Sequence, residues 1–265
     1  MNIYIISLKN EHDRRSFQNK QMEQLSLDFE FFDAITINDI SEQEYNKKSY
    51  DWVRPLKKVE LACYSSHRAI WDVIKNDTKP SLILEDDALL SIDLPKILEE
   101  LENIRDTDYI DLETVHRKKI LSRNIYKKLS SSNLIKLYQK SSGAGGYVLW
   151  PNGARKLMQL ENQKGIMLAD VHIAQCKSMN AFQLEPCPVI QFIICPKYGI
   201  EFDGINRMQN STTLAPIKAN PGITFRLKRV LFEIKKGLRR IHLAINPFTT
   251  RRHLHIEQKS FNKNY

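Results

Sequence analysis

The chain has 265 residues, of which 42% are hydrophobic and 27% are charged, and its formal net charge is +9. This composition is that of a folded globular protein and excludes an intrinsically disordered chain. No apolar run approaches the roughly 20 residues that a membrane span needs, which excludes an integral membrane protein.

Neither a secretory leader nor a disulfide framework is expected. The first eight residues lack a basic segment and already have the apolar pattern of a strand, which favours a cytoplasmic location. The four cysteines form no CxxC pair, so the sequence indicates neither a zinc site nor disulfides. We expect them to be small buried side chains in a reducing compartment.

Predicted strands and helices alternate along the first 220 residues. Strands are expected at 2–8, 29–34, 81–84, 108–113, 134–138, 147–150 and 189–194. Helices are expected at 10–25, 59–74, 94–104, 151–160 and 169–179. Segments 41–54 and 116–132 are polar and predict irregular structure, the second with some helix. This order predicts one α/β domain over 1–220, with a mostly parallel sheet flanked by helices.

The segment 82–87 is the most informative about chemistry, because three apolar residues run directly into Glu85, Asp86 and Asp87. The acids must emerge at the carboxyl end of the strand, the edge of an α/β sheet where ligands bind. Adjacent carboxylates repel one another unless a cation lies among them. Mg²⁺ and Mn²⁺ prefer oxygen ligands and often link carboxylates to substrate phosphates, so we expect such an ion here. The alternative is a solvated acidic turn that caps the next helix.

Several motifs follow one another in a fixed order over roughly residues 1–200. They are ISL at 6–8 with Arg14 and Arg15, FEFFDAI at 29–35, VELACYSSH at 59–67 with Trp71, ILEDDA at 83–88, GYVL at 146–149 with GARKL at 153–157, and LAD at 168–170. Together they resemble glycosyltransferase family 25, the transferases of lipopolysaccharide and lipooligosaccharide biosynthesis. Ala62 departs from the glycine usual in that family, and Ala169 departs from its usual proline–valine–aspartate segment.

The resemblance implies a GT-A-like, Rossmann-like fold and an inverting transfer of galactose or glucose from a UDP-sugar to a glycan acceptor. It implies donor-binding roles for Ser7, Leu8, Arg14, Arg15, Ser66, His67, Glu85 and Asp86. Asp87 is the expected direct metal ligand, with Glu85 beside it. A nucleotidyl- or phosphotransferase that uses the same acids is an alternative enzyme, and a membrane-surface adaptor is the non-enzymatic alternative.

Asp170 is the candidate general base, since an inverting transfer needs a carboxylate to take the proton of the acceptor hydroxyl. Aspartate is also a favoured N-cap, so capping of a helix over 171–179 is the competing interpretation. Asp111 and Glu113 are alternative bases in a strand-like segment near the same sheet edge. The candidates for contact with the acceptor lie in or beside a turn-rich loop: Gly145, Gly146 and Tyr147.

His67 has two interpretations. It lies on the apolar face of its predicted helix with Cys63 and Ile70, which favours a hydrogen-bonded core histidine. The resemblance instead places His67, with Ser66, near the donor.

The positive charge is concentrated in residues 221–265, which hold 11 Lys/Arg and 2 Asp/Glu. Apolar residues at 227, 231, 234, 238, 241 and 245 form one helical stripe with basic flanks, a pattern typical of helices that lie on anionic membranes. We therefore expect a basic tail that contacts the cytoplasmic face of the membrane or the acceptor. A helix docked on its own domain is the alternative. Nucleic acid is not expected as a partner, because the other 220 residues are formally neutral.

Overall fold

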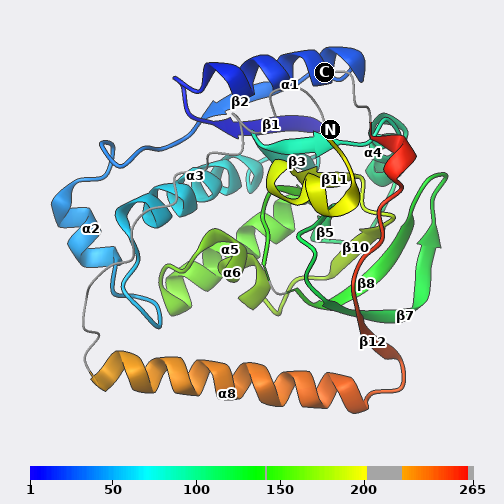
Figure 1. Cartoon of the computed structure of the whole chain (residues 1–265). Helices are drawn as coiled ribbons and strands as arrows, with labels where there is room; N and C mark the ends of the chain where they lie inside the picture. The colour runs from blue at the N-terminus through cyan, green and yellow to red at the C-terminus, as the bar shows by residue number, and fades with distance from the viewer. Residues whose placement is uncertain (141, 202–222, 262–265) are drawn as a thin grey trace.

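The computed structural model describes residues 1–140, 142–201 and 223–261 (Figure 1). These residues form a nine-stranded sheet, a three-stranded sheet and the helices that cover them. The expected α/β class is confirmed. The predicted domain boundary between residues 220 and 221 lies outside the described residues.

One half of the large sheet carries the acidic motif. Its order is β2 (Glu30–Asp33), β1 (Asn2–Ser7), β3 (Ser81–Glu85), β9 (Gly146–Leu149) and β5 (Tyr109–Asp111). β1 runs parallel to both of its neighbours, whereas β9 is antiparallel to β3 and β5. The carboxyl ends of β1, β2 and β3 therefore meet at one edge.

The other half continues through β10 (Ala181–Glu185), β8 (Asn133–Gln139), β7 (Lys119–Lys128) and β12 (Thr249–Arg252). β10 is parallel to β5, and the pairs beyond it are antiparallel, so the sheet is mixed and parallel pairing is confined to part of it. The prediction of a loop with some helix over 116–132 is wrong, because β7 forms a long hairpin with β8. Its outer part is exposed and polar, as edge strands often are.

The small sheet extends the same edge. β11 (Val189–Gln191) lies between β4 (Ala88–Leu90) and β6 (Glu113–Thr114). β4 follows the acidic motif directly, so its pairing with β11 brings a late part of the chain next to the acids. A 3₁₀ helix, η1 (Phe192–Tyr198), then replaces the end of the strand predicted over 189–194.

Helices cover both faces of the large sheet. α1 (His12–Gln24) and α4 (Leu94–Glu102) pack on one face, where Leu82 and Leu84 of β3 join a buried apolar cluster. Ile83 faces the opposite cluster. A strand whose alternate side chains are buried on both faces is expected to be largely apolar, as Leu82, Ile83 and Leu84 are.

The opposite face is covered by α3 (Lys58–Ile74), α5 (Pro151–Lys164) and α6 (Ala169–Gln175), which contact one another. α2 (Glu42–Lys48) packs against α3 and replaces part of the irregular structure predicted over 41–54. All four cysteines are free, and three are buried as expected. Cys63 on α3 is exposed, so the prediction that it is a buried side chain is wrong.

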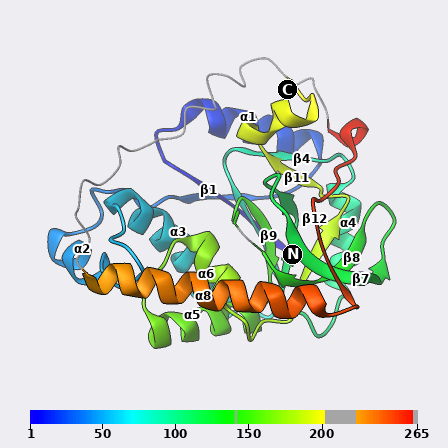
Figure 2. The ribbon, with the colours of Figure 1, turned by 60° about the horizontal axis from the view of Figure 1, so that its bottom comes forward.

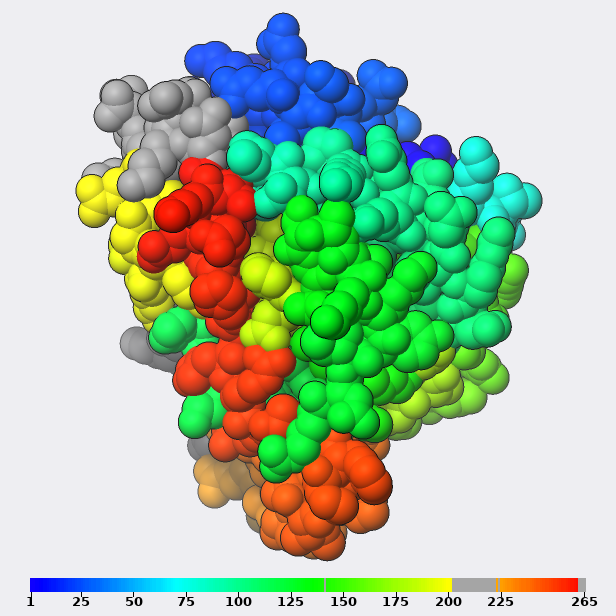
Figure 3. Space-filling model, turned by 90° about the vertical axis from the view of Figure 1, so that its right-hand side faces the viewer, coloured from blue at the N-terminus to red at the C-terminus, as the bar shows by residue number. Residues whose placement is uncertain are grey.

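α8 (Ile223–Ile245) runs along the outside of α5 and α6 and ends beside β12 (Figures 1 and 2). In Figure 3, which views α8 end-on, the helix protrudes at the bottom of the molecule. Its apolar stripe is open to solvent, with Leu227, Leu238 and Ile241 between 58% and 62% exposed. The alternative in which this stripe docks on its own domain is therefore wrong. Within the described ranges, no helix combines the length and apolar composition needed to cross a membrane.

Candidate active site at the carboxyl end of β3

A cavity of about 390 Å³ opens where β3 ends. Its lining includes Glu85 of the acidic motif, Asp170 at the start of α6, Cys63 of α3 and Arg117 from the loop before β7. Two groups that the sequence predicts to be functional, Glu85 and Asp170, thus reach one cavity from distant parts of the chain. We call this space the catalytic cavity.

The three acids of the motif have different partners. The Asp86 carboxylate accepts hydrogen bonds from Ser7 Oγ and Arg14 Nη1, both at 2.8 Å, and only 8% of the residue is exposed. Its backbone N–H donates to the carbonyl of Ile6 at 3.1 Å. Asp86 and Ser7, both predicted to bind the donor, therefore bind each other and join β3 to β1.

Arg15 has a similar structural role. Its Nε donates to the carbonyl of Leu8 at 3.1 Å, and its guanidinium lies 4.7 Å from the ring centroid of Phe31 and pairs with Asp33. These contacts hold the end of β1 against β2. Arg14 stays beside the acidic motif, where its charge acts on Asp87.

Glu85 and Asp87 are the two acids linked by one amide. Gln191 Nε2 donates to Glu85 Oε2 at 2.8 Å and lies 3.4 Å from Asp87 Oδ1. Burial, and next the charge of Glu85, raise the pKa of Asp87 to about 7, although Arg14 opposes this shift. Two carboxylates that repel each other and offer only oxygen ligands would suit a hard divalent ion such as Mg²⁺ or Mn²⁺. Gln191 has no local sequence signal, because only the pairing of β11 with β4 brings it here.

A second set of ligand-type atoms fits a metal less well. Among the described residues, one such group was found, in which ligand atoms of Cys63, His67 and Glu85 lie within 4.8 Å of one another. Partial desolvation, followed by the charges of Glu85 and Asp170, raises the pKa of the Cys63 thiol. Since the thiolate is the form that binds metals, Cys63 is a poor ligand in this setting.

His67 is buried, and it also contacts the acidic motif. Its Nε2 lies 3.2 Å from Glu85 Oε1, its Nδ1 lies 3.0 Å from the Tyr147 hydroxyl, and Trp71 Nε1 donates to that hydroxyl at 2.9 Å. All donors are satisfied when Tyr147 donates to Nδ1 and the histidine proton is on Nε2, donating to Glu85. His67 therefore orients Glu85 from behind the cavity. Ser66 instead accepts the backbone N–H of Ile35 at 2.8 Å, which is a structural contact.

Asp170 lies inside the first turn of α6, whose N-cap is Leu168. The interpretation of Asp170 as the N-cap is therefore wrong. Its Oδ1 accepts the N–H of Val171 at 2.7 Å, and its Oδ2 accepts the N–H of Gly143 at 3.3 Å. Gly143 has φ +96°, and a Cβ there would lie 2.2 Å from Glu113 Oε1, so this turn needs glycine.

The alternative bases are buried away from the cavity. Asp111 is 0% exposed and pairs with Lys119 at 2.8 Å and Lys140 at 3.0 Å. Glu113 is also 0% exposed, and its Oε1 accepts the N–H of Gly145 at 3.1 Å. Burial, followed by the charge of Asp111, raises the pKa of Glu113 to about 8. A base must reach the acceptor hydroxyl, so the geometry corrects both residues to structural roles.

The predicted acceptor contacts at Gly145, Gly146 and Tyr147 are corrected in the same way. A Cβ on Gly145 would lie 2.8 Å from Gln191 Nε2, and one on Gly146 would lie 2.7 Å from Val189. Tyr147 is 0% exposed. The glycines therefore permit close packing behind the acids, and Tyr147 holds His67.

Asp111→Asn should lower the free energy of unfolding by about 3–5 kcal/mol, because two buried lysines would lose their shared charged partner. Urea denaturation measures this loss. The matched control is Asp72→Asn, which removes a surface ion pair with Lys75 at 2.7 Å and should have a much smaller effect. Equal effects of the two substitutions would contradict a structural role for Asp111.

The family assignment follows from sequence comparison. The family model described as glycosyltransferase family 25 (LPS biosynthesis protein) matches residues 1–173, well over half of the chain. The chain belongs to glycosyltransferase family 25. It is therefore a glycosyltransferase, which confirms the predicted enzyme class. The matched region contains Glu85, Asp87 and Asp170, whereas Gln191, α8 and β12 lie beyond it.

Named relatives agree with this family. A putative glycosyltransferase of Haemophilus influenzae is 30% identical over 209 residues, which cover 75% of this chain and 73% of that protein. The lipooligosaccharide biosynthesis protein lic2B of the same species is 31% identical over 58% of this chain and 61% of its own length. Procollagen galactosyltransferase 1-B of Xenopus laevis is 23% identical over 60% of this chain but only 28% of its own length.

Proposed function

We propose that this family 25 enzyme transfers a hexose, galactose or glucose, from a UDP-sugar to a lipooligosaccharide or lipopolysaccharide glycan, with inversion and with a divalent metal ion. The observation that carries this proposal is that Glu85 and Asp170 line the same cavity. The matching family and the name of the lic2B relative support the glycan acceptor. The name of the Xenopus relative supports galactose.

On the donor side, Glu85 and Asp87 would hold Mn²⁺ or Mg²⁺. When bound, such an ion supplies positive charge against the leaving diphosphate. His67 and Gln191 fix the orientation of the Glu85 carboxylate through its two oxygens. Arg117 lines the cavity and adds a cation that can contact the diphosphate.

On the acceptor side, the oxygen of the acceptor hydroxyl attacks the anomeric carbon of the donor sugar. Asp170 takes the proton of that hydroxyl in the same step. The bond from that carbon to the diphosphate oxygen breaks in the same displacement, so the anomeric configuration inverts. The N–H groups of Gly143 and Val171 hold both oxygens of Asp170 in place. This keeps the base oriented before the acceptor binds.

A donor screen tests the proposal. UDP with Mn²⁺ should raise the melting temperature of the protein, and neither component alone should do so, because the diphosphate and the carboxylates share the ion. Hydrolysis of a set of UDP-sugars then identifies the sugar by release of UDP. Release of UMP would indicate a nucleotidyltransferase, and no stabilisation by any nucleotide–metal pair would refute the transferase site.

We also propose that the tail over 221–265 binds the enzyme peripherally to the cytoplasmic face of the membrane and that α8 is the part that contacts the lipid. Its exposed apolar side chains and basic residues such as Arg229 and Arg240 support this role. Leu238→Ser with Ile241→Ser should abolish co-sedimentation with phosphatidylglycerol vesicles. The matched control is Ile92→Ser with Ile125→Ser, which changes two exposed residues elsewhere. Unchanged sedimentation of the α8 variant would refute the membrane role.

A further inference from the structure

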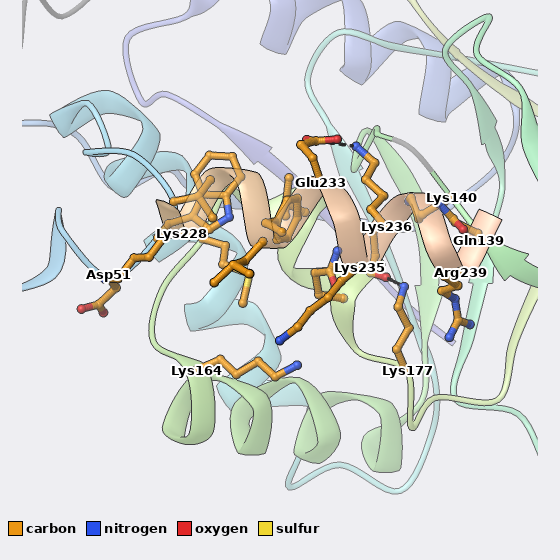
Figure 4. A pocket seen from close by; sticks show the side chains of 18 residues that line it. Asp51, Gln139, Lys140, Lys164, Lys177, Lys228, Glu233, Lys235, Lys236 and Arg239 are labelled. Carbon is orange, nitrogen blue, oxygen red and sulfur yellow. Dashed lines mark hydrogen bonds and ion pairs between the residues drawn. The ribbon is translucent and has the colours of Figure 1, made fainter. Parts of the chain in front are cut away.

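A second cavity, of about 720 Å³, lies between α8 and the helices of the catalytic domain. Figure 4 shows α8 on one side and α5 on the other, with Lys235 and Lys164 extending into the space between them. Seven lining residues are lysine or arginine and two are acidic. Those from α8 are Lys228, Lys235, Lys236 and Arg239. The others are Lys140, Lys164 and Lys177. We call this space the basic groove.

Most of this positive charge has no ion-pair partner among the residues that the structure describes. Of the two acids, Glu233 pairs with Lys236 at 3.8 Å, and Asp51 accepts the backbone N–H of Ile166 at 3.1 Å. Lys140 pairs with the buried Asp111. No carboxylate among residues 1–140, 142–201 and 223–261 forms an ion pair with the remaining five, which are Lys164, Lys177, Lys228, Lys235 and Arg239.

The groove also contains hydrogen-bond donors without partners. Arg239 Nε and Trp52 Nε1 are buried, and neither has an acceptor among the residues that the structure describes. Partial desolvation, followed by the charge of Arg239, lowers the pKa of Lys177 to about 8. A ligand with several negatively charged oxygens would satisfy the donors and relieve the repulsion between the cations.

The basic groove lies next to the catalytic cavity. Met167 and Val171 line the groove, whereas Leu168, Ala169 and Asp170 line the catalytic cavity. The two spaces are therefore on opposite sides of one short segment at the start of α6. A glycan with a hydroxyl at Asp170 would extend toward the groove, whose lining includes Trp52 and Phe232, packed edge to face with ring centroids 6.3 Å apart.

We propose that the basic groove binds a phosphate group carried by the acceptor glycan. Phosphate suits five uncompensated cations better than a carboxylate, because it carries nearly two negative charges. A flat membrane surface fits less well, since Lys235 points from α8 toward Lys164 of α5 (Figure 4), whereas the apolar stripe of α8 is exposed to solvent. That the phosphate belongs to the acceptor rests on the proposed function. That the groove binds a phosphate does not depend on it.

Titration calorimetry with glucose 6-phosphate tests the groove in an Asp87→Asn background, which removes phosphate binding at the donor site. Glucose 6-phosphate should bind, glucose should not, and the affinity should fall as salt is added. Lys235→Gln with Arg239→Gln should weaken binding at least about tenfold, the equivalent of 1.4 kcal/mol. The matched control, Arg229→Gln with Arg240→Gln, removes the same charge from α8 outside the groove and should leave affinity within about twofold.

Arg239 Nη2 also donates to the carbonyl of Tyr138 at 3.1 Å, so the loss of Arg239 could weaken binding by disturbing the fold. A second variant that keeps Arg239 tests the groove without this effect. Lys164→Gln with Lys235→Gln changes one residue on each wall and should give the same weakening. Equal affinity in all variants, or equal weakening in the control, would overturn the proposal. So would displacement of glucose 6-phosphate by phosphatidylglycerol vesicles, which would make the membrane the occupant.

The two proposals can fail separately. If the groove is wrong, glucose 6-phosphate does not bind, but UDP with Mn²⁺ still stabilises the unsubstituted protein. If the assignment of the donor site is wrong, UDP with Mn²⁺ does not raise the melting temperature, but the groove variants still bind glucose 6-phosphate more weakly.

Discussion

Asp87→Asn is expected to weaken metal-dependent UDP binding by about 100-fold or more. The substitution keeps the size of the side chain but removes the charged oxygen ligand that a hard divalent ion requires. The measurement is calorimetric titration of UDP in the presence of Mn²⁺. The melting temperature without ligand should not fall, because a neutral amide at this position would relieve the repulsion between Asp87 and Glu85.

Asp28→Asn is the matched control, since Asp28 is exposed and is far in sequence from the residues that line the cavity. It should leave UDP binding unchanged. Asp86→Asn separates structure from metal binding: it removes the negative charge that faces Arg14 and one of the two oxygens that accept from Arg14 and Ser7, so its main effect should be on stability. Full UDP and Mn²⁺ binding by the Asp87 variant would contradict the assignment of Asp87 as metal ligand.

Asp170→Asn is expected to reduce kcat by about 10²–10⁴-fold, the contribution typical of a general base. UDP binding should stay within about twofold, because Asp170 acts on the acceptor. Steady-state kinetics with the donor identified by the screen, together with UDP titration, measures both effects. An equal loss of donor binding would instead indicate that Asp170 shapes the whole cavity.

Glu113→Gln is the comparison that decides between the carboxylates. The raised pKa of Glu113 keeps it largely protonated at neutral pH, a state that glutamine mimics, so turnover should change little. If turnover survives in Asp170→Asn and is lost in Glu113→Gln, the assignment of the base is reversed.

The sequence predicts the strand before the acids well, because consecutive apolar residues that end in carboxylates fit few structures other than a buried strand at a sheet edge. It also predicts α8, whose apolar stripe has the helical period. β7 was missed for a physical reason. Lys119 at its start is buried as the partner of Asp111, and most of the strand is exposed and polar, so hydrophobic alternation gives no signal.

Within the site, local pattern identifies which residue types are present but not what each one contacts. Asp86 and Asp87 are adjacent, yet one faces Arg14 and Ser7 whereas the other lies near Gln191. Asp111 looks equivalent to Asp170 until its two lysine partners are known. These differences depend on pairings between distant segments, which a single sequence does not show.

If α8 lies on a membrane as proposed, its connection to β12 limits which acceptors the enzyme can reach. Only residues 246–248 separate the end of α8 from β12, which pairs with β7 of the large sheet, so the helix cannot turn independently of the domain at that end. A lipid surface that holds α8 would then hold the catalytic cavity at a fixed height. The enzyme would then select glycans by the distance between their terminal sugar and the lipid.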